Sequence, residues 1–417
     1  MPTQESLSLD TIDVIGPGHY QKHGYPHREW TYLRKHRPVF RCEYPGTHPF
    51  WAITKYADIV EISRQPRLFL NGPRQQIFVY ESGMKPGKAK PFRHLLDMDP
   101  PDHGEYRAIV SRNFTPRAVR SFQSKVEEIT RGVIDELIGS RQCDFVNDVS
   151  AKIPLVVIAE MLGVPHEDRE KLFRWTNEAI GGLDPEFQDG SAAHDTYERG
   201  RIGLFSYFEE MAAKRIKSPI DDLTGIVAKA TIGGAPMPKF EMMSYFYLLV
   251  VAGNETTRNA TTGGMLAFIE NPGEWRKLRE NPALIKPAVE EILRWTSPVI
   301  QFARTAAEDA EIHGQKIKRG ESFCLFYPSA NRDEDVFAEP FRFDISRDPN
   351  PHLAFGVGEH FCLGAHLARL ELEVIFSQLI SRIENVELAG PVERLRSSFI
   401  GGIKHMPITF DINSRAA

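Results

Sequence analysis

The chain has 417 residues, of which 51 are basic and 56 acidic, so its formal net charge is −5. Proteins that bind nucleic acid normally carry a basic excess, and this balance argues against a nucleic-acid partner. Apolar residues make up 41% and charged residues 26% of the chain, a composition typical of a globular protein with a sizeable core.

The sequence indicates neither a secretion signal nor a membrane anchor. Residues 1–14 are polar and lack the basic and then apolar pattern of a signal peptide, so we expect a flexible leader there. The longest apolar run, residues 245–253 (YFYLLVVAG), is too short to cross a bilayer. These observations predict a cytoplasmic protein, and we expect a monomer.

The four cysteines are Cys42, Cys143, Cys324 and Cys362. None forms a CxxC pair, which argues against a disulfide framework or a structural zinc site and favours a reducing compartment. Cys42 and Cys324 lie in strand-like apolar text and are predicted to pack as small hydrophobic residues. Only Cys362 has an unusual setting.

The first third of the chain predicts a small β portion. A short helix is expected over residues 27–38, two strands over 39–44 and 50–55, and a helix over 56–69. Residues 71–97 are rich in Gly, Pro and Lys without a clear period. A loop this long is either disordered or functional, often as a cover over an active site.

The remainder is predicted to be mostly helical. Helical spacing prevails from about residue 101 to 290, with a probable connector at residues 181–194. Short strands with turns at Gly314 and Gly320 follow, then a helix after Cys362 and two terminal strands. No repeat or linker divides the chain, so we expect a single domain over residues 1–417, mainly α with a minor β portion.

Residues 239–270 contain no proline and predict one helix of roughly 45 Å, at 1.5 Å per residue. Its middle changes from apolar residues to Ala252, Gly253, Asn254, Glu255 and Thr256. One interpretation is a solvated face with a tolerated kink. The other is a groove for a small ligand, where the carboxylate and the hydroxyl hand over protons.

Three further patterns are weak when taken alone. Glu291 and Arg294 have ordinary ion-pair spacing on a helix, and His103 and Arg107 lie four apart on one face. Arg304 lies in apolar text and invites a buried anionic partner.

The segment LAFGVGEHFCLGAHLARLELE starts at residue 353 and places glycines around one cysteine just before a predicted helix. Its order Phe355-Gly-x-Gly-x-His360-x-Cys362-x-Gly364 resembles the haem-binding signature of the cytochrome P450 superfamily. Residues 252–257 (AGNETT), 291–294 (EILR) and 99–107 (DPPDHGEYR) resemble three more motifs of that family, in the family's order. The resemblance covers essentially the whole chain and implies the cytochrome P450 fold, a triangular prism with haem between the central long helix and the cysteine-loop helix.

The resemblance also implies roles for these residues. Cys362 would be the thiolate ligand of the iron in haem b, a ligand that pushes electron density to favour O–O cleavage. The following helix N-terminus favours the thiolate, and the surrounding glycines permit tight turns with positive φ. Phe355 would pack beside the sulfur, and Glu291 and Arg294 would form a structural ion pair. The other implied haem contacts are His103, Arg107, Arg304, His360 and Gly364.

The implied activity is that of an oxidoreductase of EC 1.14 type, a monooxygenase that inserts one atom of O2 into a C–H bond. Glu255 and Thr256 match the family's acid–alcohol pair for proton delivery, with Glu255 supplying protons from solvent. No reductase is fused to the chain, so electrons would come from a ferredoxin and its NAD(P)H-dependent reductase. Three arginines near the family's proximal face could contact an acidic ferredoxin, although a solvated basic face is equally expected: Arg112, Arg117 and Arg120.

An apolar substrate is expected: a terpenoid or a steroid, with branched fatty acids or alkyl-aromatic compounds as the alternative. This expectation follows from the resemblance to bacterial hydroxylases of such compounds. Gln301 is a candidate polar anchor. The residues expected to line the pocket are Ile77, Phe78, Val79, Leu248, Val251, Ala252, Val299, Ile300, Gln301 and Ile400.

Two other classes of function are weighed. A haem protein that binds or senses a ligand without turnover would not need the Glu255–Thr256 pair. A hydrolase with Cys362 as nucleophile and His360 or His366 as base would need an exposed, activated thiol. The order of the four motifs does not favour that class.

Overall fold

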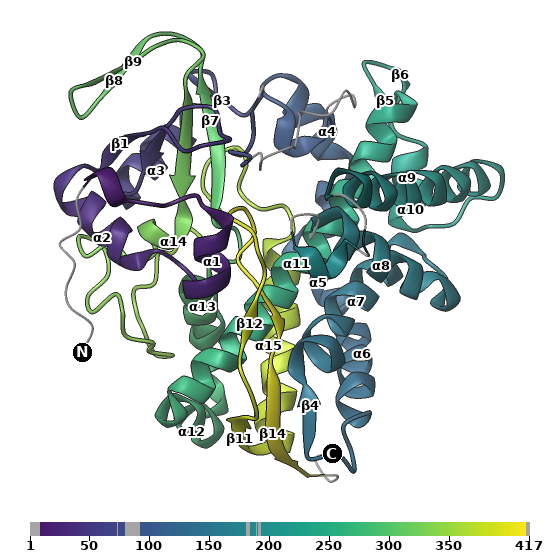
Figure 1. Cartoon of the computed structure of the whole chain (residues 1–417). Coiled ribbons are helices and arrows are strands. Elements are labelled where there is room, and N and C mark those ends of the chain that lie inside the picture. Colours follow the sequence, from purple (N-terminus) through teal and green to yellow (C-terminus); the bar gives the residue numbers. More distant parts are fainter. Residues whose placement is uncertain are drawn as a thin grey trace.

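The structure, a computed structural model, describes residues 9–72, 74–79, 92–180, 184–188, 190 and 193–413. Helices make up most of this part, and short strands form small sheets (Figure 1). The chain is therefore mainly α with a minor β portion, as predicted. The helices are α1 (Pro17–His23), α2 (His27–His36), α3 (Tyr56–Ser63), α4 (Asp102–Ser111), α5 (Pro116–Ser121), α6 (Gln123–Asp135), α7 (Lys152–Leu162), α8 (Arg169–Ile180), α9 (Ala193–Lys217), α10 (Leu223–Ala228), α11 (Lys239–Glu270), α12 (Pro272–Glu280), α13 (Ile285–Thr296), α14 (Tyr327–Ala330) and α15 (Ala365–Arg382).

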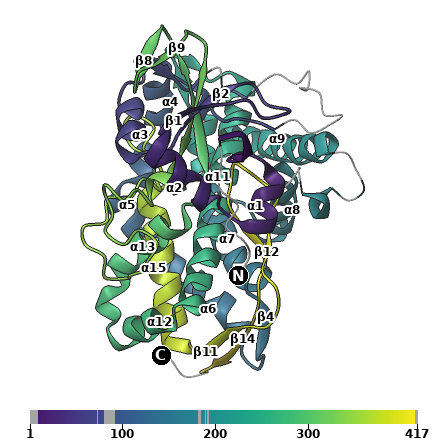
Figure 2. The ribbon, with the colours of Figure 1, turned by 60° about the vertical axis from the view of Figure 1, so that its left-hand side comes forward.

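The two larger sheets lie at opposite ends of the molecule (Figures 1 and 2). One has the strand order β1-β2-β10-β7-β3, with β10 parallel to β2 and the other pairs antiparallel; another has the order β11-β14-β4. The strands are β1 (Val39–Cys42), β2 (Phe50–Ile53), β3 (Phe69–Leu70), β4 (Gln142–Asp144), β5 (Thr231–Ile232), β6 (Ala235–Pro236), β7 (Gln301–Ala306), β8 (Ala310–Ile312), β9 (Gln315–Ile317), β10 (Ser322–Phe326), β11 (Ile383–Leu388), β12 (Glu393–Arg394), β13 (Ile403–His405) and β14 (Pro407–Ile412).

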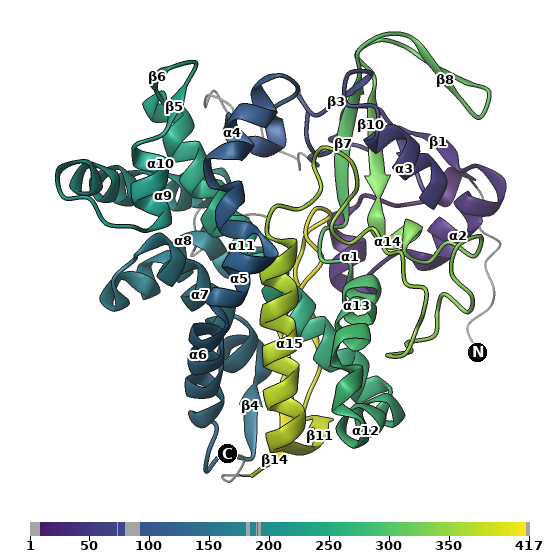
Figure 3. The same ribbon diagram turned by 180° about the vertical axis from the view of Figure 1, so that it is seen from behind.

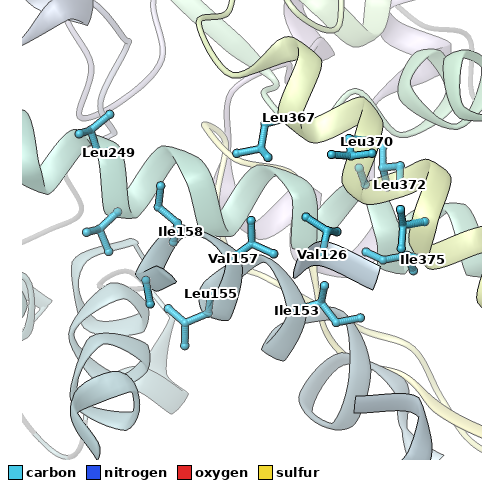
Figure 4. Packing of buried hydrophobic residues seen from close by; sticks show 14 of the residues in the cluster. Val126, Ile153, Leu155, Val157, Ile158, Leu249, Leu367, Leu370, Leu372 and Ile375 are labelled. Carbon is cyan, nitrogen blue, oxygen red and sulfur yellow. The ribbon is translucent and has the colours of Figure 1, made fainter. Parts of the chain in front are cut away.

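Helix α11 is the element around which the core is built. It covers the predicted range of residues 239–270 without interruption. It packs against α7, α9, α13 and α15, and α15 runs beside it when the molecule is seen from behind (Figure 3). In Figure 4, apolar side chains of α7 and α15, among them Val157 and Leu367, approach α11 from two sides. A helix buried on several sides needs apolar residues around most of its circumference, which explains why residues 245–251 show no amphipathic period.

Two sequence predictions need correction. The leader is shorter than residues 1–14, because Val14 and Ile15 are buried against Trp30 and Phe326 in a second core cluster. Residues 1–8 lie outside the described part. The helix predicted over residues 56–69 ends at Ser63, and Phe69 joins the sheet as β3. The packed state predicted for Cys42 and Cys324 is confirmed, since both are buried in the same cluster.

No helix among the described residues has both the length and the apolar character that a membrane span requires. This finding concerns only the ranges given above.

Helix α13 carries the Glu291–Arg294 pair to the centre of a network that fixes the chain before the cysteine loop. The two side chains are fully buried and make two hydrogen bonds of 2.7 and 2.8 Å with each other. Arg294 also donates to the carbonyl oxygens of Asn331, Pro340 and Arg342. The pair thus holds residues 331–342 against α13.

Glu291 accepts further hydrogen bonds from the segment that follows. Its carboxylate receives the backbone N–H of Asp344 at 2.9 Å, the amide of Asn350 at 3.1 Å and the guanidinium of Arg347 at 3.2 Å. Because each oxygen has several donors, the cost of burying this charge is offset. One carboxylate therefore orders the irregular chain that leads to residue 353.

We expect Glu291→Gln to lower the free energy of unfolding by about 3–5 kcal/mol, because it leaves the fully buried guanidinium of Arg294 and the partly buried one of Arg347 without a carboxylate. The matched control is Glu339→Gln, which breaks a Glu–Arg pair of the same spacing whose side chains are 70% and 56% exposed. Its expected cost is under about 1 kcal/mol. Urea unfolding followed by circular dichroism measures both, and equal costs would contradict the assigned role.

Candidate active site

The cysteine loop, residues 353–364, connects the network just described to the N-terminus of α15. Two of its glycines have left-handed backbone conformations, with φ of 68° at Gly356 and 81° at Gly358. A Cβ at Gly358 would lie 2.4 Å from the carbonyl oxygen of Ser63, so glycine is required there by both strain and space. The predicted positive-φ turns are found at these two positions.

Gly364 differs from that expectation. Its φ is −85°, which any residue adopts, and it caps the N-terminus of α15. A Cβ at this position would meet no protein atom within 4 Å. Neither backbone strain nor protein packing explains the glycine, whereas close approach of a bound group would.

Cys362 is held just before α15. Its backbone N–H donates to the carbonyl oxygen of Phe355 at 2.9 Å, which closes the loop on itself. Burial raises the pKa of the thiol, whereas the Gly364 N–H that hydrogen-bonds the sulfur and the charges of Arg107 and Arg369 oppose this rise. The groups that favour the thiolate thus come from the loop, α4 and α15, while burial is the larger influence and acts against it.

Glu290 of α13 fixes both sides of the cysteine loop. Its carboxylate contacts His352 at 3.0 Å on one side and Arg369 of α15 at 2.6 Å on the other. Burial acts to raise the pKa of Glu290, but the hydrogen bonds from Arg369 and His352 outweigh it and lower the pKa to about 2. The guanidinium of Arg369 also lies 4.6 Å over the ring of Phe355, the residue predicted to pack beside the sulfur.

Helix α4 brings its two predicted residues to the same loop. The ring of His103 lies 4.1 Å from that of His360, measured between centroids, and its Nδ1 is 3.0 Å from Glu359. Arg107 donates to the carbonyl oxygen of Phe361 at 2.7 Å. The spacing of four residues on one helix face thus places both side chains against the cysteine loop.

Arg304 reaches this cluster from β7. Its side chain is 4% exposed, and among the described residues no carboxylate forms a salt bridge with it. Burial lowers the pKa of Arg304 and of His360, the latter to about 2, and the charges of His103, Arg304 and Arg107 lower the pKa of His360 further. The lowered pKa values leave both imidazoles uncharged at neutral pH, so the cluster combines two guanidinium cations with two neutral N–H donors. A buried guanidinium among such donors indicates an anionic partner.

The middle of α11 is the other wall of the site. Ala252 is exposed and Thr256 partly exposed, although residues 243–250 and 257–262 are buried. The Thr256 hydroxyl donates to the carbonyl oxygen of Ala252 at 2.9 Å, so its oxygen can still accept a hydrogen bond. This pattern favours the groove interpretation over a solvated helix face.

Glu255 is buried, whereas we expected it to contact the solvent from which it would take protons. Its side chain is 1% exposed and forms an ion pair with Arg258, one turn further along α11. Burial raises the pKa of Glu255, and the charge and hydrogen bond of Arg258 oppose the rise. Any proton that passes through Glu255 is therefore exchanged in a buried environment.

The residues expected to line the pocket divide into several environments. Val299 and Ile400 face each other in an isolated antiparallel bridge, and Leu248 and Val251 lie just before Ala252 on α11. Ile300 is fully buried. That these positions line one substrate pocket stays a prediction.

Segment 74–79 is anchored rather than loose. Ile77 and Val79 are buried in the second core cluster, and Phe78 is 54% exposed. The side-chain amide of Gln301 receives the Ile77 N–H at 3.3 Å and donates to its carbonyl oxygen at 3.1 Å. Gln301 thus holds the segment. The polar atoms of its side chain are paired with the Ile77 main chain, whereas they were expected to anchor a substrate. Residues 73 and 80–91 of the predicted loop lie outside the described residues.

Sequence reasoning missed Arg258, Glu290, Tyr327 and Arg369. Arg258 follows Glu255 by three residues and Arg369 follows Cys362 by seven, so helical spacing carried a signal for both. Tyr327 lies against Arg304 across β7 and β10, a proximity that depends on sheet order and has no local signal.

The residues present fit haem. The Nε2 atoms of His103 and His360 are buried without a protein partner among the described residues, and both lie beside Arg107 and the salt-bridge-free Arg304. Such donors match two carboxylates. A haem ring also accounts for three other features. The Cys362 thiol can ligate its iron, the lack of a Cβ at Gly364 leaves room for close approach, and α11 is accessible at Ala252.

Comparison with known proteins agrees with this geometry. A family model described as Cytochrome P450 matches residues 207–390. A steroid C26-monooxygenase of Mycolicibacterium smegmatis is 39% identical, over 92% of this chain and 90% of that protein. A methyl-branched lipid omega-hydroxylase of Mycobacterium tuberculosis is 38% identical, over 91% and 89%.

Among solved structures, a Mycobacterium marinum cytochrome P450 in complex with pseudoionone superposes with a TM-score of 0.88 at 34% identity. The match covers 97% of this chain and all of that one. The matches in sequence and in structure extend over nearly the whole chain, and this chain therefore belongs to the cytochrome P450 family as a monooxygenase.

Proposed function

We propose that this monooxygenase hydroxylates a steroid or a methyl-branched lipid, with haem held by Cys362 and electrons supplied by a ferredoxin. The observation that carries the haem assignment is the convergence of two arginines and two imidazoles beside the cysteine loop, with buried Arg304 lacking a carboxylate partner among the described residues. Bound haem supplies the iron at which O2 is activated for insertion into a C–H bond. The chain's own residues bind it, orient the substrate and move protons.

Four residues would bind the haem carboxylates: His103 and Arg107 from α4, Arg304 from β7 and His360 from the loop. Burial removes competing water from these donors, so each hydrogen bond to an anion is strong. Phe355, whose ring lies under the guanidinium of Arg369, would pack beside the Cys362 sulfur. Gly364 leaves the space for close approach.

Thr256 and Glu255 would deliver protons on the α11 side. Thr256 offers an acceptor oxygen next to the accessible Ala252, because its own proton is donated to the backbone. Glu255 directly precedes Thr256 on the same turn and can exchange a proton within the buried interior. A binding or sensing protein would not require this arrangement.

An apolar substrate is supported by the residues near Ala252. Leu248, Val251, Val299 and Ile400 carry no polar side-chain atoms, and the amide of Gln301 is already paired with Ile77. The named relatives act on a steroid and on a methyl-branched lipid, so we favour these classes over terpenoids. Terpenoids remain the alternative, and the substrate test below includes monoterpenoids for comparison.

Ferredoxin would dock beside the cysteine loop. Arg112, Arg117 and Arg120 are exposed, and none forms a salt bridge within the described ranges. Helix α5 and the turn after α4 both contact α15, which starts at the cysteine loop. Arg112 also lines a surface depression of about 850 Å³ between α4 and α10.

The reduced protein with carbon monoxide should show the red-shifted Soret band of a thiolate-bound haem. Cys362→Ala should abolish that band, because no other sulfur lies at the loop. The matched control Cys143→Ala, at a partly buried cysteine of β4, should keep it. A shifted band that persists in Cys362→Ala would overturn the ligand assignment.

The substrate proposal is tested by the low- to high-spin shift of the haem and by product analysis. We expect cholest-4-en-3-one to give a larger shift than testosterone, which lacks the branched side chain. A methyl-branched fatty acid should exceed its straight-chain isomer. A larger response to monoterpenoids than to both of these classes would contradict the proposal.

Charge reversal at Arg112, Arg117 and Arg120 together should slow reduction by a [2Fe–2S] ferredoxin by about 10-fold or more, because electrostatic steering is lost. Arg319→Glu, on the exposed turn before β10, is the control and should change little. Stopped-flow reduction at several salt concentrations measures the effect. A slowing that does not depend on salt would argue against an electrostatic docking face.

A further inference from the structure

The ion pair between Glu255 and Arg258 is the most deeply buried charged contact beside the proposed proton-delivery site. The two side chains are 2% and 7% exposed, and Arg258 Nη2 donates to Glu255 Oε2. They lie three residues apart on α11, one turn beyond the accessible Ala252. The guanidinium therefore contacts the acid directly.

Arg258 is fixed from a second helix. Its Nη1 donates to Oδ1 of Asn177 on α8 at 3.0 Å. The arginine thus spans from α8 to the acid on α11 and has little freedom to leave Glu255. The other carboxylate oxygen, Glu255 Oε1, has no protein partner among the described residues and remains able to exchange a proton.

Glu371 of α15 is a buried glutamate whose pKa is not lowered by an adjacent guanidinium, so it serves as a comparison for Glu255. It is 2% exposed, and burial alone raises its pKa well above the ordinary value. For Glu255 burial acts in the same direction, but Arg258 opposes it. The difference between the two glutamates is the adjacent guanidinium, so Arg258 decides how readily Glu255 releases a proton.

We propose that Arg258, held by Asn177, is a positioning residue that sets proton delivery by acting through Glu255. This inference rests on the proposed monooxygenase function. Without Arg258, Glu255 would remain protonated and be a weaker acid, so proton transfer to the site would slow. The role is distinct from that of Thr256, which faces the accessible turn.

The first test does not depend on turnover. Infrared difference spectra of the holoprotein at neutral pH compare wild type with Arg258→Gln. We expect the variant to gain a carboxylic-acid C=O band, and Arg258→Gln/Glu255→Gln to lack it. Arg258→Lys, which keeps a positive charge, should show a weaker band. No band in folded Arg258→Gln would overturn the proposal.

The second test is a double-mutant cycle on the rate of product formation, with cholest-4-en-3-one as the probe substrate. Arg258→Gln should reduce the rate of product formation about tenfold, the change in proton ratio produced by one pKa unit. In the Glu255→Gln background it should have no further effect. An equal loss in both backgrounds would show that Arg258 acts independently of Glu255.

Two further variants guard against misfolding and general effects. Asn177→Ala removes only the α8 contact and should cause a smaller loss that also vanishes in the Glu255→Gln background. Arg201→Gln breaks another i, i+3 pair, with Glu198 on α9, and should affect neither readout. If no substrate is hydroxylated at all, the proposed function fails, while the infrared result still decides the role of Arg258.

Discussion

The buried Glu291–Arg294 ion pair is the interaction on which the arrangement of the site depends. The chain from residue 331 to 353 has little regular structure of its own, and α13 supplies the carboxylate and the guanidinium that satisfy its backbone groups. Asn331 connects this network to the cysteine loop, because its side chain accepts a hydrogen bond from the Leu353 N–H where the loop begins. Glu290, next to Glu291, then fixes the loop on both sides. Three residues of one helix therefore position the thiol.

A second constraint comes from α11. A helix that crosses the core must be apolar almost all round, yet the site needs polar and small residues in its middle. The chain meets both needs by changing composition within one turn at Ala252 and Gly253. Gly253 has a packing reason as well, since a Cβ there would lie 3.0 Å from Ile158 of α7. Small residues thus allow the helix to pack on one side and to stay accessible on the other.

Much of this architecture could be predicted from the sequence, for reasons that differ between elements. Helix α11 was found because it lacks proline and is long, and the cysteine loop because its glycines serve conformations that only glycine adopts freely. The short strand β4 was missed, because its pairing with β14 depends on residues more than 260 positions away in the chain. The burial of Glu255 and its ion pair with Arg258 were also missed, since burial depends on packing and no local pattern reveals it. Gln301 was expected to face substrate, whereas the fold pairs its amide with Ile77.

That pairing has a consequence for how the substrate range could evolve. The hydrogen bonds between Gln301 and Ile77, and between the Ala303 N–H and the Gln75 carbonyl oxygen, all engage the main chain of segment 74–79. Main-chain groups are the same for every residue type, so these hydrogen bonds persist when a side chain of the segment is exchanged, while Ile77 and Val79 add apolar anchorage in the second core cluster. Phe78 lies between these two buried residues and is 54% exposed, so core packing limits its side chain less than theirs. The same scaffold can then accommodate lipids of different shape, with mutational change concentrated at exposed positions of the segment.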